Sequence, residues 1–171
     1  MNFVPPIRKC DIANGPGCRV SLFVSGCRNK CKGCFNPEAQ DFSYGIEFTE
    51  HDLTELIDLM DHDYVEGLSI LGGEPMEEEN QPTVAKIIHK TRTKFGQSKN
   101  IWVYTGYVLE KDLDPQRRKW IPGVTDGIIK NIDVLVDGPF VEDLKDITLK
   151  FRGSSNQRII HLKDGVPERI E

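Results

Sequence analysis

Short apolar runs alternate with segments of helical periodicity along most of this chain, and this alternation restricts the fold more than any other feature. The apolar runs lie at 19–24, 68–71, 101–104 and 132–136, and each is followed within two residues by a glycine. Runs of this length with glycine-bearing turns predict buried β-strands. Strands that alternate with helices predict right-handed β-α-β crossovers, a mainly parallel sheet and the α/β class.

Apolar residues recur at helical spacing between these runs, in two groups: Leu53, Leu56, Ile57 and Met60, then Val84, Ile87 and Ile88. Thr49, with Asp52 three residues later, is a typical N-cap for the first helix. Asn80 and Pro82 are typical of the start of the second. A third helix is predicted from about 109 to 119, although Pro115 weakens its middle.

Glycine-bearing segments follow all four predicted strands, at 25–27, 72–75, 105–107 and 137–140. Open α/β sheets bind their ligands beyond the carboxyl ends of parallel strands. We therefore expect these four segments to meet at one edge of the sheet and to form the functional site there.

Length and composition predict one domain, residues 1–171, with no repeat or linker to divide it. The net charge of -5 argues against a nucleic-acid partner, which a basic surface would attract. No apolar stretch is long enough for a membrane span, and no secretory signal is visible, so we expect a cytoplasmic protein with no membrane partner. The acidic segments 58–63 and 76–80 are expected to lie on solvated faces.

Three of the five cysteines, Cys27, Cys31 and Cys34, form a C-x3-C-x2-C motif within eight residues. Iron–sulfur cubanes normally take four cysteines, so three would leave one iron open for another ligand. The neighbouring Arg28, Lys30 and Lys32 are expected to favour thiolates. The alternative is a zinc knuckle completed by Cys10, Cys18 or a histidine, although the histidines lack zinc-finger spacing.

The cysteine motif resembles that of the radical S-adenosylmethionine superfamily, in which the open iron chelates the methionine moiety of the cofactor. The segment Gly72-Gly73-Glu74-Pro75 is similar to the glycine-rich segment that contacts the methionine amino group there. The resemblance implies a partial (β/α) barrel, one [4Fe-4S] cluster held by the three cysteines, and S-adenosylmethionine as second cofactor. A complete barrel takes about 250 residues, whereas this length suffices for four or five β-α units.

Further segments resemble the activating proteins of anaerobic (class III) ribonucleoside-triphosphate reductases; they lie at 11–17, 22–27, 33–36, 101–107, 134–138 and 152–157. The resemblance implies cofactor contacts from Gly33, Cys34, Phe35, Gly72, Gly73 and Glu74. Gly33 stands where the superfamily usually has an aromatic residue, and Phe35 follows Cys34, so Phe35 or the backbone around it is expected at the adenine.

The activity implied is reductive cleavage of S-adenosylmethionine, followed by formation of a glycyl radical on the large subunit of the reductase. Five cysteines are too few for an additional ferredoxin-like insert, so an external one-electron reductant such as flavodoxin is expected. The alternatives are an activase of a formate-lyase type of glycyl-radical enzyme and a non-catalytic, zinc-stabilised binding module. Cys10 and Cys18 match no motif cysteine and are expected to be free thiols, because an odd cysteine count argues against a disulfide framework.

Overall fold

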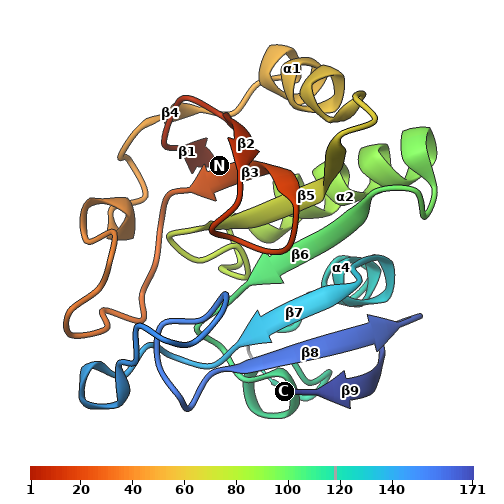
Figure 1. The fold of residues 1–171 in the computed structure, drawn as a ribbon. Helices are drawn as coiled ribbons and strands as arrows, with labels where there is room; N and C mark the ends of the chain where they lie inside the picture. Colours follow the sequence, from red (N-terminus) through yellow and green to blue (C-terminus); the bar gives the residue numbers. More distant parts are fainter. Residues whose placement is uncertain (118) are drawn as a thin grey trace.

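The computed structural model describes residues 1–117 and 119–171 as a mixed α/β fold with one large sheet (Figure 1). The strands are β1 (Asn2–Phe3), β2 (Arg8–Asp11), β3 (Cys18–Val24), β4 (Ile46–Glu47), β5 (Val65–Gly72), β6 (Asn100–Tyr104), β7 (Val134–Asp137), β8 (Arg158–Lys163) and β9 (Val166–Ile170). The helices are α1 (Glu50–Met60), α2 (Gln81–Phe95), α3 (Leu109–Asp112) and α4 (Thr125–Asn131), with 3₁₀ turns η1 (Glu38–Gln40) and η2 (Glu142–Leu144).

The four predicted strands are confirmed as β3, β5, β6 and β7, and they form the parallel centre of the sheet. The strand order is β4-β1-β3-β5-β6-β7-β8-β9, and β2 pairs with β3. All pairings outside the central four are antiparallel. The prediction of a mainly parallel sheet is therefore wrong at both edges. In the described part of the chain the strands form a path with two ends, which does not confirm a barrel.

The main core lies between one face of the sheet and the helices. Alternate residues of β3, including Leu22 and Val24, face Leu56 of α1 and Ile87 of α2 in a single buried cluster. The predicted capping box is confirmed, because the Thr49 side chain accepts from the Asp52 amide while the Asp52 carboxylate accepts from the Thr49 amide. This arrangement satisfies amides at the first turn that have no partner within α1.

The predicted third helix is wrong beyond Asp112, where α3 ends. The Asp114 carboxylate accepts from the Gln116 amide at 2.9 Å, and its carbonyl accepts from the Arg117 amide at 2.8 Å. This turn replaces the helix because a residue before proline is disfavoured in the helical conformation. The end of the predicted segment includes residue 118, which lies outside the described residues.

The opposite face of the sheet carries a smaller apolar cluster of Trp102, Val134, Val136 and Ile159. Beside it lies Arg19, whose side chain is fully buried. Its guanidinium donates to Ser69 Oγ at 2.7 Å, to Asn100 Oδ1 at 2.7 Å and to the Leu68 carbonyl at 2.8 Å. Burial lowers the pKa of Arg19 to about 10, so the cation persists at neutral pH and links β3 to β5 and β6.

Cys10 and Cys18 form a disulfide, with their Cα atoms 5.0 Å apart, so the expectation of two free thiols is wrong. The two residues come together because β2 and β3 are antiparallel neighbours joined by a short loop. The pair lies at the start of β3, at the opposite end of that strand from the cysteine motif.

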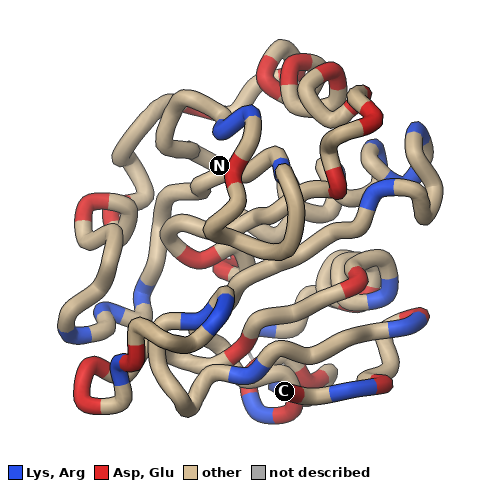
Figure 2. The backbone as a smooth tube through the Cα atoms, in the orientation of Figure 1, with Lys and Arg blue, Asp and Glu red and all other residues tan. Residues whose placement is uncertain are grey.

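Acidic residues lie along α1 and the turn after it (Figure 2). Asp58, Asp61 and Asp63 are exposed, which confirms the predicted solvated face there. Within residues 1–117 and 119–171, no helix combines the length and apolar character that a membrane crossing requires.

Candidate metal and cofactor site

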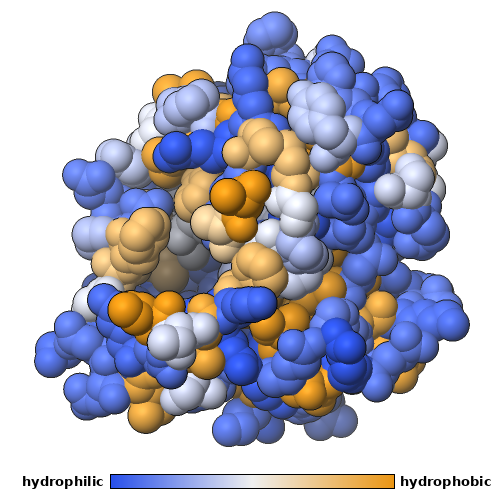
Figure 3. All heavy atoms as spheres, in the orientation of Figure 1, coloured by the Kyte–Doolittle hydropathy of each residue, from blue (hydrophilic) through white to orange (hydrophobic). Residues whose placement is uncertain are grey.

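A cavity of about 470 Å³ lies at the carboxyl ends of the four parallel strands. Phe23, Leu71, Tyr104 and Val136, at or next to the ends of these strands, form part of its wall. The face drawn in Figure 3 is hollowed at its left side, and hydrophobic side chains gather around the hollow. The prediction that the segments after the parallel strands meet at one edge is therefore confirmed.

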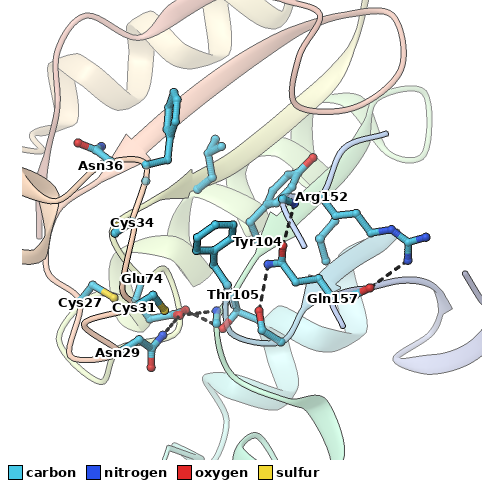
Figure 4. Close-up of a pocket in the computed structure, with 18 of the residues that line it drawn as sticks. Cys27, Asn29, Cys31, Cys34, Asn36, Glu74, Tyr104, Thr105, Arg152 and Gln157 are labelled. Carbon is cyan, nitrogen blue, oxygen red and sulfur yellow. Dashed lines mark hydrogen bonds between the residues drawn. The ribbon is translucent and has the colours of Figure 1, made fainter. Parts of the chain in front are cut away.

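All eight predicted site residues line this one cavity: Cys27, Cys31, Gly33, Cys34, Phe35, Gly72, Gly73 and Glu74. The three cysteines are free thiols of intermediate exposure. Cys27 and Cys31 lie beside Glu74 in Figure 4, and Arg152 and Gln157 lie farther along the same pocket. Phe35 lines the cavity and is 96% exposed.

The cysteine loop leaves β3 and is fixed to η1 by backbone hydrogen bonds. The Gly26 amide donates to the Ala39 carbonyl at 2.8 Å, and the Cys27 amide donates to the Gln40 carbonyl at 3.1 Å. Gly33 has a φ of +69°, and a Cβ there would lie 2.8 Å from Glu142 Oε1. Only glycine adopts this conformation without strain, so Gly33 allows the turn between the second and third cysteines.

Burial raises the pKa of Cys27 to about 11, and the nearby Glu74 and Glu77 carboxylates add to that effect. Burial also raises the pKa of Cys31. The expectation that Arg28, Lys30 and Lys32 favour thiolates is wrong at Cys27 and Cys31, because the pKa of both thiols is raised. Arg28 and Lys32 are paired with carboxylates. Metal binding at these thiols must therefore release protons.

Glu74 is only 1% exposed, and its carboxylate connects the cysteine loop with the segments that follow β5 and β6. Its Oε1 accepts from Thr105 Oγ1 at 2.7 Å and from the Met76 amide at 2.9 Å. Its Oε2 accepts from the Gly106 amide at 2.7 Å and from Asn29 Nδ2 at 3.0 Å (Figure 4). Burial raises the pKa of Glu74 to about 7, against the opposing effect of these hydrogen bonds.

The expectation that segment 76–80 is solvated is wrong, because Met76, Glu77 and Asn80 are buried. Asn80 donates from its amide group to the Ser25 and Glu74 carbonyls, both at 2.9 Å. Glu77 receives donors from Arg28, Tyr107 and Lys119. A local charge pattern cannot predict this burial, because two of these donors are more than 40 residues away in the sequence.

Asp137, the last residue of β7, has a structural role. Its carboxylate accepts from Arg158 Nε at 2.8 Å and from the Leu109 amide at 2.9 Å. The segment 152–157 closes on itself, because Gln157 Oε1 accepts from the Gly153 amide at 2.8 Å. Arg152 and Gln157 nevertheless line the cavity, so this segment is both a closed loop and a cavity wall.

The donor set suits a cluster better than a single ion. Within residues 1–117 and 119–171, no three His, Cys, Asp or Glu side chains converge closely enough to bind one metal ion. A structural zinc site needs such convergence. In a cubane each thiolate binds a different iron, so the ligands stand apart around the cluster. Cys10 and Cys18, considered as further zinc ligands, are bonded to each other.

Sequence reasoning missed Asn29. Among the described contacts, its side chain is the one in the cysteine loop that hydrogen-bonds the Glu74 carboxylate. A Cβ at Gly106 would lie 2.3 Å from Asn29 Nδ2, so the glycine after β6 makes room for this contact. The glycines that follow the strands were the available signal, because close approach of two loops is a common reason for glycine at such positions.

Comparison with known proteins gives consistent results. A family model described as a 4Fe-4S single cluster domain matches residues 13–160. Proteins named anaerobic ribonucleoside-triphosphate reductase-activating protein are similar over almost their whole length. The Escherichia coli K12 protein is 39% identical over 155 residues, which are 90% of this chain and 94% of that protein. The protein of Enterobacteria phage T4 is 36% identical over 162 residues, which are 94% of this chain and 94% of that protein. The protein of Vibrio cholerae is 40% identical over 153 residues, which are 88% of this chain and 92% of that protein.

The similarity covers the cysteine motif, the glycine-rich segment and the strands that carry both. Because it extends over about nine-tenths of the chain at more than one-third identity, it reflects common ancestry of the whole fold and not of one loop. The chain belongs to the family of anaerobic ribonucleoside-triphosphate reductase-activating proteins.

Proposed function

We propose that this protein activates an anaerobic ribonucleoside-triphosphate reductase by forming a glycyl radical on its large subunit, as a radical S-adenosylmethionine enzyme. The observation that carries the proposal is that three free thiols and the segment Gly72-Gly73-Glu74 line one cavity beyond the parallel strands. The names of the relatives and the 4Fe-4S family model support the same function.

Cys27, Cys31 and Cys34 would hold the [4Fe-4S] cluster and leave one iron for the amino and carboxylate groups of S-adenosylmethionine. A cluster held there would supply one electron for reductive cleavage of S-adenosylmethionine to methionine and a 5′-deoxyadenosyl radical, and this radical would take a hydrogen atom from a glycine Cα of the reductase. An external reductant such as flavodoxin provides the electron. The protein's own contribution is to position these groups and to exclude water.

The segment after β5 is proposed to bind the methionine moiety through its backbone. The Gly73 amide donates to the Val24 carbonyl at 2.7 Å, and the Glu74 amide donates to the Gly26 carbonyl at 2.8 Å. These bonds hold the segment directly against the start of the cysteine loop. Since all four hydrogen-bond positions of the Glu74 carboxylate are occupied by protein donors, we assign Glu74 the role of shaping the site.

Phe35 is proposed to approach the adenine. Phe35 is among the residues that line the cavity, and its high exposure leaves it free to stack on a bound base. Stacking of a base on an aromatic ring is worth about 1–3 kcal/mol, which would add to the affinity for the cofactor. A partial barrel, as the resemblance implies, would leave the mouth open for a loop of the reductase.

The test is anaerobic reconstitution with iron and sulfide, reduction with dithionite, and measurement of 5′-deoxyadenosine. Addition of the reductase large subunit should then produce the paramagnetic resonance doublet of a glycyl radical. Cys31→Ala should abolish both signals, because the loss of one of three ligands sheds or exposes the cluster. A colourless protein that binds zinc in place of iron, or one that forms no 5′-deoxyadenosine, would contradict the proposal.

A further inference from the structure

The carboxylate of Glu77 lies fully buried against the cysteine loop, next to the first cysteine of the motif. Its Oε1 accepts from the backbone amide of Arg28 and from the Tyr107 hydroxyl, each at 2.8 Å. Its Oε2 accepts from Arg28 Nη1 at 2.8 Å and from Lys119 Nζ at 2.7 Å. Four donors from three separate segments therefore meet at one side chain.

The contact with the Arg28 amide acts on the cysteine itself. That amide belongs to the peptide bond formed by the carbonyl group of Cys27, so accepting from it fixes the orientation of the peptide that follows Cys27. Tyr107 lies just after β6, and its side chain is also buried. Glu77 thereby joins the loop that carries Cys27 to the segment after β6, which lies two strands away from β3 in the sheet.

The charges around Glu77 are nearly balanced. Arg28 also binds Glu79, at 2.5 Å and 2.9 Å, so two carboxylates face the two cations Arg28 and Lys119. Burial alone would raise the pKa of Glu77, but the hydrogen bonds from Lys119, Tyr107 and Arg28 lower it below its ordinary value. Glu77 is thus ionised at neutral pH, and its removal would leave the cations in excess.

We propose that Glu77 is a positioning residue for the cluster, because its buried carboxylate fixes the backbone next to Cys27 and offsets the charge of Arg28 and Lys119. The inference rests on the proposed function, since it requires a cluster at Cys27. The reduction potential of an iron–sulfur cluster depends on the hydrogen bonds and charges around it. A negative charge beside the cluster disfavours an added electron, so losing Glu77 should shift the potential to more positive values.

The experiment compares the wild-type chain with Glu77→Gln, Glu77→Asp and Arg28→Ala after identical anaerobic reconstitution. Iron and sulfide per chain and the reduction potential of the cluster are measured for each. Glu77→Gln should bind several-fold less iron, and the clusters that form should have a more positive potential. Glu77→Asp, which keeps the charge but shortens the side chain, should lose iron while its potential stays near that of the wild type.

Arg28→Ala separates positioning from charge. It retains the backbone amide that Glu77 accepts from but removes a cation, so iron content should persist and the potential should become more negative. A purely structural role of Glu77 cannot produce potential shifts of opposite sign in Glu77→Gln and Arg28→Ala. Glu55→Gln, on the exposed side of α1, is the matched control and should change neither quantity.

Thermal unfolding of the metal-free proteins shows whether each variant folds. If Glu77→Gln fails to fold, the inference is decided by Glu77→Asp and Arg28→Ala, and an unchanged potential in Arg28→Ala overturns it. If Glu77→Gln folds and has the iron content and reduction potential of the wild type, the inference about Glu77 is also overturned. In that case the proposed function still stands, provided that the wild-type protein cleaves the cofactor. A wild-type chain that binds no iron would overturn both the inference about Glu77 and the proposed function.

Discussion

Asn29 Nδ2 donates to Glu74 Oε2 across 3.0 Å, which joins the cysteine loop to the segment that follows β5. The same carboxylate also receives the Gly106 amide and the Thr105 hydroxyl after β6. One buried side chain thus holds together the ends of three strands that carry the candidate site. Its ionisation should therefore be visible in the stability of the whole protein.

Glu74 should make the free energy of unfolding depend on pH. Its pKa is about 7 when folded and its ordinary value is 4.5, so the native state binds more protons between these values. Stability must therefore fall as pH rises through this range, by about 3 kcal/mol in all. Glu74→Gln removes this contribution. Urea unfolding of the metal-free proteins at about pH 5 and about pH 8 should show a smaller loss in the variant. Equal losses would contradict the assignment.

Gly73→Ala should disturb the site through backbone contact. A Cβ at Gly73 would lie 2.7 Å from both the Gly26 and Ala39 carbonyl oxygens, and neither can move without shifting the cysteine loop. We expect a loss of about 1–3 kcal/mol in unfolding free energy, together with a lower iron content. Gly127→Ala in α4 is the control, because nothing lies within 4 Å of its added Cβ. That variant should gain up to about 1 kcal/mol. If Gly73→Ala and Gly127→Ala changed the unfolding free energy and iron content equally, the close packing of Gly73 against the Gly26 and Ala39 carbonyls would be refuted.

Arg19→Lys should destabilise the sheet even though the charge is kept. The guanidinium bonds Ser69, Asn100 and Leu68 in three directions, and an ammonium group at the end of a lysine cannot reproduce this planar fork. Leaving buried acceptors unpaired should cost about 2–4 kcal/mol, measured by urea unfolding. Arg8→Lys on the exposed strand β2 serves as the comparison and should change little. An undiminished stability in Arg19→Lys would show that these bonds contribute nothing.

Cys10→Ser should leave iron content and cofactor cleavage unchanged, because Cys10 lies by the start of β3 and the cluster ligands follow its end. Without reductant, the variant should lose about 2–3 kcal/mol in unfolding free energy, as expected for opening a short disulfide loop. Dithiothreitol should abolish the difference between variant and wild type. A lost cluster would instead mean that Cys10 serves the site.

The position of the site could be predicted from the sequence because it depends on local patterns. The apolar runs before Cys27 and Gly72 are long enough to identify β3 and β5, and parallel strands bring their carboxyl ends to one edge. The N-cap of α1 was predictable for the same reason, since Thr49 and Asp52, which form it, lie within four residues of each other.

The edges of the sheet could not be predicted in this way. β8 and β9 form a hairpin around Asp164 and Gly165, both with positive φ, and their pairing with β7 depends on contacts between distant segments. The burial of Glu77 likewise depends on Arg28 and Lys119, which lie 49 and 42 residues away. A carboxylate in a run of acidic residues carries no local sign that such partners exist.

Mössbauer spectroscopy of the oxygen-free, ⁵⁷Fe-reconstituted protein, recorded with and without S-adenosylmethionine, tests most directly whether Cys27, Cys31 and Cys34 hold a cluster with one open iron. The account predicts a [4Fe-4S] spectrum in which one iron site changes when the cofactor is added and the other three do not. A spectrum that the cofactor leaves unchanged at every iron, or a protein that retains no iron, would contradict it.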